Sequence, residues 1–273
     1  MARQTKSTRS GSVRSLERGL ALLVAMNRRK LASVSDLAKD TSLPRPTVYR
    51  LLETLTDTGF VSRESATDRF RPARGVRALS DGFIDDEWVT NIATPMMAEF
   101  TRAYVWPVSL FTFEAGKMLV RDTTHRLSSL SIDYGMVGRR MGMLRTAGCL
   151  AYLAFCPDNE RRVILDLLSQ SEDPEDHEAR ETARLNRLFK TIRANGYATQ
   201  ERVINPRAAS ISVPILVGRQ VHGCVSLIYI ASALTVTEVE KRLLPPLRDM
   251  TLSLAEALQA EKPSLAKFPA ARA

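Results

Sequence analysis

The strongest constraint on the fold is a series of short helical patterns in residues 13–59 that is followed by a hairpin pattern. Apolar residues at helical spacing predict a first helix from Val13, and Ser33 with Asp36 forms the capping-box pattern that begins a second. Residues 43–46 carry two prolines, which the first turn of a third helix tolerates because its N–H groups lack intrahelical partners. Gly59 is placed to end that helix. Two apolar stripes support these predictions: Val13, Leu16, Leu20, Leu23 and Val24 in the first helix, and Val48, Leu51, Leu52 and Leu55 in the third.

A hairpin pattern follows the third helix. Residues 60–63 and 69–71 read as short strands, joined by a polar turn at Ser65–Asp68. Three short helices followed by a hairpin is the order of a winged helix-turn-helix. We therefore predict such a domain at residues 13–73, after a flexible basic arm at residues 1–12.

The charge of the chain is concentrated at its N-terminal end. The net charge is +9, and residues 1–80 hold 16 Lys and Arg against 7 Asp and Glu, whereas residues 81–273 hold 23 of each. Such an asymmetry favours one domain that binds a polyanion and one that does not. The alternative, a basic face that is merely solvated, remains open on charge alone.

Polar residues lie off the leucine stripe of the third helix, where they would face a DNA major groove. An arginine there can donate two hydrogen bonds to guanine, and a threonine can contact a phosphate or a thymine methyl. Arginines of the hairpin would neutralise flanking phosphates. The alternative of an ordinary three-helix core explains the leucines but not the localised charge. The candidate contacts to double-stranded operator DNA are Arg45, Thr47, Tyr49, Arg50, Arg63, Arg69 and Arg71.

A linker helix at residues 74–87 is expected to join this domain to a larger one at residues 88–261, with a flexible tail at residues 262–273. Val76, Leu79 and Phe83 form an apolar stripe on the linker without an obvious partner in their own domain, which makes them candidate dimer contacts. Pairing would suit DNA operators, because these usually consist of two half-sites.

The larger domain mixes strand and helix patterns. A second stripe, Trp88, Ile92, Met96 and Phe100, predicts its first helix, and period-two patterns predict strands that pair in a sheet. We predict an α+β domain in which helices pack on a central antiparallel sheet. The expected elements are a hairpin at 108–113 and 118–123, helices at 146–155, from 158 and at 179–195, strands at 197–203, 211–217 and 221–230, and one long helix at 235–260.

Several classes of protein are disfavoured by the sequence. Cys149, Cys156 and Cys224 form no CxxC motif, which favours a reduced compartment, and the apolar stretch around residues 221–234 is too short and interrupted to span a membrane. The three histidines show no metal-site spacing, and GxSxG, Walker A and GxGxxG motifs are absent from the sequence. We expect a cytoplasmic protein that is not an enzyme and has no catalytic residue, metal or cofactor, although residue types alone leave open a pair between Cys149 and His222.

Four stretches of the sequence resemble the IclR (isocitrate lyase regulator) family of bacterial transcription factors. They are VRSLERGLALL, LPRPTVYRLLETLTDTGFV, GMVGRRMGMLRTAGCLAYLA and SISVPILVGRQVHGCVSLIYI. The resemblance covers about residues 13–258 and departs from the usual pattern at Cys149, where a lysine commonly follows the glycine. It implies a sensor domain whose sheet resembles that of a GAF domain.

Within the family, VRDTTHRLSSLS, MVGRRMGMLRTAG and LAFCP resemble regulators of hydroxyphenylpropionate catabolism. This implies a small aromatic acid as effector, homodimers that form tetramers, activation of an aromatic catabolism operon, and RNA polymerase as a further partner. A repressor that responds to a non-aromatic organic acid is the alternative. The resemblance implies effector contacts at Met143, Thr146, Ala147, Gly148, Cys149, Ser210, Ser226 and Ile228.

The chemistry of an aromatic acid suits these positions, because a concave apolar pocket would bury the ring and free N–H groups at the helix start near Thr146 would bind the carboxylate. Simpler explanations compete with each assignment. Met141 and Met143 are more often core residues, and Cys149 is more often a small buried hydrophobe. The pair Arg139–Arg140 is either solvated or bound to Asp133.

Overall fold

The computed structural model describes residues 12–29 and 31–265. The chain divides into two compact units, Met1–Ile84 and Asp85–Ala273, which are described separately below. Residues 1–11 of the expected arm and residues 266–273 of the expected tail lie outside the described residues. The last helix continues to Leu265, so the expectation of a flexible tail from residue 262 is wrong for its first four residues.

The N-terminal unit has the predicted order of three helices and a hairpin. Its elements are α1 (Arg14–Asn27), α2 (Val34–Thr41), α3 (Arg45–Asp57), β1 (Val61–Glu64), β2 (Arg69–Pro72) and α4 (Arg74–Ser80). The capping box is confirmed: the Asp36 N–H donates to Ser33 Oγ at 3.2 Å, and the Ser33 N–H donates to Asp36 Oδ2 at 3.0 Å. Gly59, with φ +78°, follows the end of α3, where the Phe60 N–H donates to the Leu55 carbonyl at 2.9 Å.

The core of this unit lies between α1, α2, α3 and the hairpin. Val48 and Leu52 of α3 are buried as predicted, whereas Leu51 and Leu55 are only half-buried. In α1 the core face is Leu22, Ala25 and Met26. The stripe that predicts α1 is therefore mostly its outer face: Val13, Leu16, Leu20 and Val24 are each more than half exposed.

The linker helix is shorter than expected. Helix α4 ends at Ser80, whose Oγ donates to the Arg77 carbonyl, and Asp81 and Gly82 are poor helix formers. Phe83 is thus outside the helix and 71% exposed. The expectation of a helix through residue 87 is wrong, because the acidic residues that end it bind within the C-terminal unit.

Those acidic residues are held by one arginine of the sheet. Arg121 forms ion pairs with Asp85 and with Asp86, the latter at 2.9 Å. The hydrogen bond to Asp85 raises the pKa of Arg121 above its usual value. These contacts fix the start of the C-terminal unit.

The C-terminal unit contains one antiparallel sheet of six strands in the order β5-β4-β3-β8-β7-β6. The order confirms the predicted α+β class with a central antiparallel sheet. The turn between β3 and β4 is Ala115–Gly116, both at positive φ. The strands are β3 (Val108–Glu114), β4 (Lys117–Thr123), β5 (Arg140–Met141), β6 (Ala198–Glu201), β7 (Ala208–Val217) and β8 (Gln220–Ile230).

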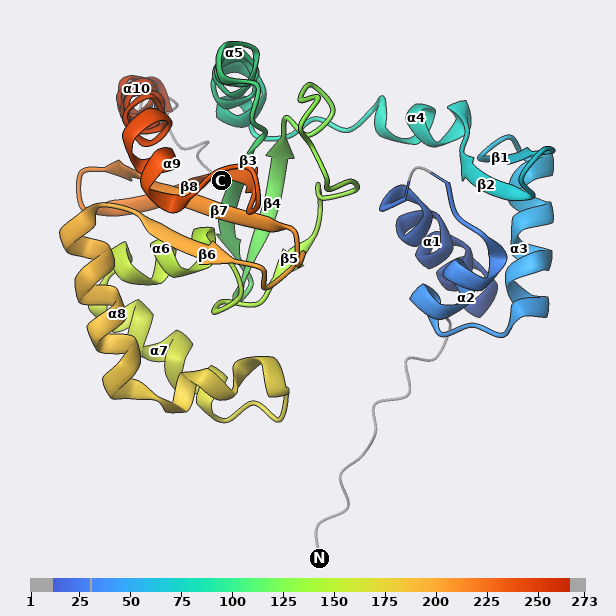
Figure 1. The fold of residues 1–273 in the computed structure, drawn as a ribbon, viewed down its shortest axis with the longest axis horizontal. Helices are drawn as coiled ribbons and strands as arrows, with labels where there is room; N and C mark the ends of the chain where they lie inside the picture. Colours follow the sequence, from blue (N-terminus) through green and yellow to red (C-terminus); the bar gives the residue numbers. More distant parts are fainter. Residues whose placement is uncertain (1–11, 30, 266–273) are drawn as a thin grey trace, which may run out of the picture. The chain divides into compact units, whose positions relative to one another are not determined.

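Helices cover both faces of the sheet (Figure 1). On one face lie a π-helical turn η1 (Val89–Ala93), α5 (Thr94–Tyr104), α9 (Val236–Arg242) and α10 (Leu244–Leu265). On the other lie α6 (Ala147–Phe155), α7 (Asp158–Ser169), the 3-10 turn η2 (Pro174–Arg180) and α8 (Thr182–Asn195).

Alternation along the strands separates two environments. Ile211 and Val213 of β7 face the α10 side, as do Val225 and Leu227 of β8. The residues between them point to the α6 side, and several of these are serines. Ser212 and Ser226 are buried and hydrogen-bonded to each other, and Ser210 and Ser226 line the cavity described below.

Other predicted boundaries in the C-terminal unit also differ from the structure. The long C-terminal helix is interrupted at Leu243, because Pro245 and Pro246 lack the N–H donors that a continuous helix needs and instead occupy the first turn of α10. Helix α8 begins three residues later than expected, after η2. Strand β6 ends at Glu201, because Arg202 has a left-handed backbone with φ +57° that turns the chain out of the sheet.

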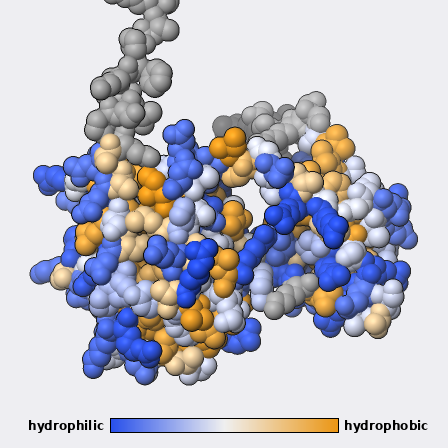
Figure 2. Space-filling model, turned by 90° about the horizontal axis from the view of Figure 1, so that it is seen from above, coloured by the Kyte–Doolittle hydropathy of each residue, from blue (hydrophilic) through white to orange (hydrophobic). Residues whose placement is uncertain are grey.

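The surface is mixed in character. On the face drawn in Figure 2, hydrophilic residues surround small hydrophobic patches. Within residues 12–29 and 31–265, no helix is long and apolar enough to cross a membrane.

Candidate functional site

Helix α3 presents the first candidate surface. Its buried residues Val48 and Leu52 anchor one side to the core, which leaves the opposite side exposed. Arg45, Tyr49 and Arg50 are exposed there, and no hydrogen bond or ion pair joins the side chain of Arg45 or Arg50 to another described residue. Thr47 is half-buried. This face can therefore offer two unpaired guanidinium groups and a phenol to a partner.

The hairpin adds arginines beside this surface, but one of them is engaged. Arg63 binds Asp68 in the turn, with Nη2 and Oδ1 2.6 Å apart, so its charge is partly neutralised. Arg71 donates from Nε to Ser62 Oγ at 3.3 Å, which leaves its other N–H groups available. Arg69 is exposed. Of the three predicted hairpin contacts, Arg69 and Arg71 are better placed than Arg63 to bind phosphate.

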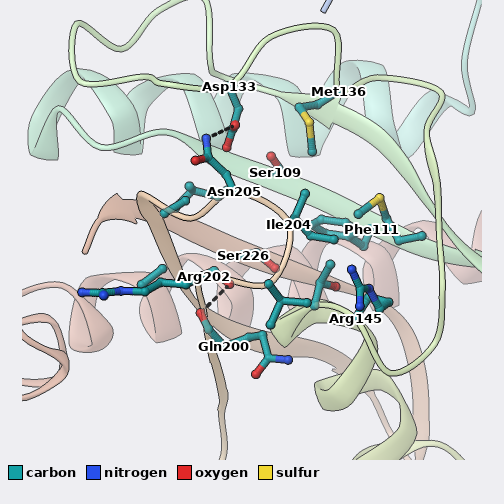
Figure 3. Close-up of a pocket in the computed structure, with 17 residues that line it drawn as sticks. Ser109, Phe111, Asp133, Met136, Arg145, Gln200, Arg202, Ile204, Asn205 and Ser226 are labelled. Carbon is teal, nitrogen blue, oxygen red and sulfur yellow. Dashed lines mark hydrogen bonds between the residues drawn. The ribbon is translucent and has the colours of Figure 1, made fainter. Parts of the chain in front are cut away.

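The second candidate site is a cavity of about 60 Å³ in the C-terminal unit, on the α6 side of the sheet (Figure 3). Its walls come from β3, β7 and β8, from the loop before β5, from the residues before α6, and from the β6–β7 loop. The lining residues are Ser109, Phe111, Asp133, Met136, Met141, Arg145, Thr146, Gln200, Arg202, Val203, Ile204, Asn205, Ala208, Ala209, Ser210, Ser226 and Ile228.

Four of the eight predicted effector residues line this cavity: Thr146, Ser210, Ser226 and Ile228. The other four, Met143, Ala147, Gly148 and Cys149, do not. Met143, Ala147 and Cys149 are completely buried, because the first turn of α6 packs directly on the sheet. Met143 is part of the buried cluster around α6 and lies outside this cavity, so its contact with a ligand ring stays a prediction.

The start of α6 is capped from within. Thr146 Oγ1 accepts from the Cys149 N–H at 3.1 Å and donates to Cys149 Sγ at 3.0 Å. One of the N–H groups that the sequence assigns to a carboxylate is therefore already bonded. Burial raises the pKa of the Cys149 thiol to about 11, so the thiol stays protonated near neutrality. A protonated thiol is a poor nucleophile, which argues against a catalytic pair with His222.

Gly148 lies where α6 approaches the sheet most closely. A Cβ atom at this position would be 3.0 Å from Ser226 Oγ and 3.2 Å from Cδ2 of Phe111, and both residues line the cavity. Replacing Gly148 by valine would therefore push against these two side chains.

We expect Gly148→Val to lower the free energy of unfolding by about 1–3 kcal/mol, the usual effect of overpacking a core. We also expect it to weaken binding in the cavity, because the displaced side chains of Phe111 and Ser226 line that space. Denaturation curves and calorimetry measure the two effects. Gly82→Val is the matched control, since a Cβ there meets nothing within 4 Å. Equal stability for both variants would contradict this account of the α6 packing.

The cavity has polar groups that the sequence analysis did not assign to it. Arg145 pairs with Glu175, with Nη2 and Oε1 3.3 Å apart, while its Nε is buried without a hydrogen-bond partner. Asp133 Oδ1 accepts from Asn205 Nδ2 at 2.8 Å. The proposed pairing of Asp133 with Arg140 is not formed, because Arg140 binds Glu114 at 3.0 Å.

The serine hydroxyls of the cavity are already bonded within the sheet. Ser109 Oγ lies 2.9 Å from Thr123 Oγ1, and Ser226 Oγ donates to Ser212 Oγ at 3.0 Å. Ser210 Oγ donates to the Gln200 carbonyl at 3.4 Å. These serines make the wall polar without leaving a strong donor free. In the part of the chain that the structure describes, no group of three or more His, Cys, Asp or Glu residues could hold a metal ion.

Comparisons with known proteins identify the domains that carry the two candidate sites. The profile described as the IclR helix-turn-helix domain matches residues 15–65, and that of the bacterial transcriptional regulator IclR C-terminal domain matches residues 83–256. The Pca regulon regulatory protein of Pseudomonas putida is 25% identical over 256 residues, which cover 89% of this chain and 84% of that protein.

Two solved structures share the fold. The IclR protein of Thermotoga maritima has a TM-score of 0.58 at 19% identity and covers 90% of this chain and 99% of its own. An IclR homologue from Microbacterium hydrocarbonoxydans, complexed with 4-hydroxybenzoate, has a TM-score of 0.54 at 19% identity with the same coverage. The matched profiles together include α3, strand β1 and every strand of the six-stranded sheet. The chain therefore belongs to the IclR family, whose members are DNA-binding transcriptional regulators and not enzymes.

Proposed function

We propose that this regulator senses a small aromatic carboxylic acid and controls an aromatic catabolism operon, as an activator. The observation that carries the proposal is the cavity, whose walls are largely apolar and which contains an arginine with a buried, unpartnered Nε. The names of two relatives support the ligand class: one regulates the Pca regulon, and another was solved with 4-hydroxybenzoate. The resemblance to regulators of hydroxyphenylpropionate catabolism narrows the candidates to hydroxylated phenylpropionic acids.

The proposed DNA contacts follow the exposed face of α3. Arg45 and Arg50 are assigned to base edges, with Thr47 and Tyr49 beside them, because an exposed helix face of this size fits the major groove. Arg69 and Arg71 are assigned to phosphates, and Arg63 makes a weaker contribution because Asp68 shares its charge. The partner is a double-stranded operator.

Operator recognition also requires assembly in this proposal. A single winged helix contacts too few base pairs to be selective, so a homodimer, or a tetramer of two dimers, would bind paired half-sites. An activator would further contact RNA polymerase. Since the DNA of a bacterium lies in its cytoplasm, the protein is assigned to that compartment.

The effector acts by biasing two arrangements of the DNA-binding units. Binding changes operator affinity only to the extent that the acid prefers one arrangement over the other. A coupling of about 1–3 kcal/mol would be ordinary for such a switch. The proposal needs no larger effect than this.

The alternative is a repressor that responds to a non-aromatic organic acid. The cavity volume of about 60 Å³ favours it, because a compact acid needs less rearrangement than a benzene ring. Binding pockets for drug-sized ligands have volumes of about 300 Å³ or more. An aromatic acid thus requires the cavity to widen on binding.

A thermal-shift screen separates the two. Hydroxylated phenylpropionic, cinnamic and benzoic acids are compared with short aliphatic acids such as pyruvate. At a concentration 100 times its dissociation constant, the effector should stabilise the protein by about 2.7 kcal/mol, or by roughly 5–10 °C for a domain of this size. Stabilisation by the aliphatic acids alone would replace our proposal by the alternative, and stabilisation by none of the acids would contradict both.

A further inference from the structure

The cavity has opposite charges at its two ends. Figure 3 shows Arg145 beside Phe111 on one side, with Asp133 and Asn205 on the far side. The residues between them are mostly apolar or hydrogen-bonded within the sheet, among them Phe111, Ile204 and Ser226. Arg202 also lines the cavity, but its guanidinium points away from the other labelled side chains. The chemistry of the two ends is therefore set by Arg145 and Asp133.

At the Arg145 end of the cavity, one guanidinium N–H group lacks a hydrogen-bond acceptor. Buried donors are rarely left without a partner, and a charged one is the most costly to leave so. Nε of Arg145 is buried and unpartnered, while Nη2 binds a Glu175 side chain that is 54% exposed. A ligand carboxylate would supply the missing acceptor and bind the guanidinium through two N–H groups. Glu175 would then lose part of its hold on Arg145.

The Asp133 end offers an acceptor. One carboxylate oxygen accepts from Asn205, which leaves the second oxygen with capacity for a donor. His125 is close enough to Asp133 for its ring to feel the charge of that residue, and its Nδ1 lies 2.7 Å from Ser131 Oγ. Burial lowers the pKa of His125, so its ring is neutral near pH 7 and does not cancel the charge of Asp133.

We propose that the effector is a monocarboxylic acid with a hydrogen-bond donor, such as a phenolic hydroxyl, at the end opposite its carboxylate. Arg145 binds the carboxylate and Asp133 accepts from the hydroxyl, so these two residues determine specificity. The inference rests on the proposed function, and it refines the ligand class by its polarity. It also excludes dicarboxylic acids, because a second carboxylate would face Asp133 and leave two like charges together.

The wall that must move to admit a ring is the β6–β7 loop. Ile204 lines the cavity and is nevertheless 39% exposed, so little protein covers it. The loop is held to the opposite wall by the hydrogen bond between Asn205 and Asp133. A phenol that donates to Asp133 would reach its carboxylate next to this bond.

Titration calorimetry on the full chain tests the proposal with four acids that share the 3-phenylpropionate skeleton and differ in the para substituent. They are 3-(4-hydroxyphenyl)propionate, 3-phenylpropionate, 3-(4-methoxyphenyl)propionate and 3-(4-carboxyphenyl)propionate. The wild type should bind the hydroxylated acid at least roughly tenfold more tightly than the other three, as expected when a charged group gains one hydrogen bond. A dicarboxylate that binds as tightly as the hydroxylated acid would overturn the proposal without any variant.

Two substitutions test which residue binds the carboxylate of the ligand and which accepts from its hydroxyl. Arg145→Gln should weaken the binding of all four acids by roughly tenfold or more, because each carries the carboxylate that Arg145 binds. Asp133→Asn should reduce the preference for the hydroxyl and strengthen binding of the dicarboxylate, since the repelling charge is gone. Arg102→Gln, which removes an exposed charge on α5 away from the cavity lining, is the control and should change neither. Melting temperatures without ligand confirm that the variants fold.

The outcomes separate this inference from the function on which it rests. If the wild type binds none of the acids, the proposed aromatic effector is wrong and this inference falls with it. If the acids bind but Asp133→Asn leaves their relative affinities unchanged, only the assignment of the ends is wrong. If Arg145→Gln binds the hydroxylated acid as tightly as the wild type, Arg145 is not the carboxylate anchor.

Discussion

Arg50→Ala should weaken operator binding by about 1–3 kcal/mol and reduce discrimination among operator sequences. Arg50 is exposed on α3 and has no ionic partner among the described residues, so its guanidinium is available for the bidentate contact that guanine offers. Fluorescence anisotropy with an operator and with single-base variants of it measures both effects. The loss should be largest for the base pair that Arg50 contacts.

Arg71→Ala provides the contrast, because a phosphate contact carries no sequence information. It should weaken binding to all DNA sequences alike and reduce the slope of log affinity against log salt concentration by about one. Arg102→Ala, on α5 of the C-terminal unit, is the control for a lost surface charge. If Arg50→Ala and Arg71→Ala both bind the operator as the wild type does, α3 and the hairpin are not the DNA-contacting surface.

Leu20→Asp should convert the protein to monomers and abolish selective operator binding at micromolar concentration. A groove of about 820 Å³ runs along α1 and α3. Thr47 and Arg50, which are assigned to DNA, line part of it, so the dimer contact is assigned to its exposed leucines Leu16, Leu20 and Leu79, which are 61, 51 and 62% exposed. Of the linker stripe predicted from the sequence, Leu79 lines this groove together with the leucines of α1. Each buried leucine stabilises an interface by about 1.5–3 kcal/mol, and a two-fold dimer contains each twice.

Sedimentation velocity gives the oligomeric state, and the same samples are titrated with operator DNA. Leu127→Asp, which alters a 55% exposed leucine of the C-terminal unit, is the matched control and should leave assembly unchanged. Phe83→Asp should have a smaller effect, because Phe83 lies beyond the end of α4. Dimers that persist in Leu20→Asp would place the interface elsewhere.

The fold was predictable wherever local chemistry determines it. Ser33 with Asp36 and Gly59 are local signals: the first begins α2 and the second follows the end of α3, as predicted. Period alone could not show which side of α1 faces the core. Its most regular apolar stripe is exposed in the single chain, whereas Ala25 and Met26 are buried. Regular spacing marks a face that can be covered and does not say whether the same chain covers it.

The site was predictable only in part, for a related reason. Ser210 and Ser226 follow from strand alternation, and Thr146 follows from its position before a helix. Arg145 and Asp133 lie in loops, where no periodicity relates residues that are distant in sequence. Their role depends on contacts with Glu175 and Asn205, which only the folded chain brings near. The one local signal for Arg145 is its position directly before Thr146, the residue that caps the start of α6.

The central claim, that an acid bound in the C-terminal unit controls DNA binding, is tested by one titration. Labelled DNA from upstream of the genes adjacent to this one is titrated with the protein, with and without 3-(4-hydroxyphenyl)propionate at saturation. The account predicts that the acid changes operator affinity about 5- to 150-fold, and that Arg145→Gln loses this response while it binds the operator normally without the acid. Equal operator affinity with and without the acid, in a sample shown by calorimetry to be saturated with it, would contradict the account.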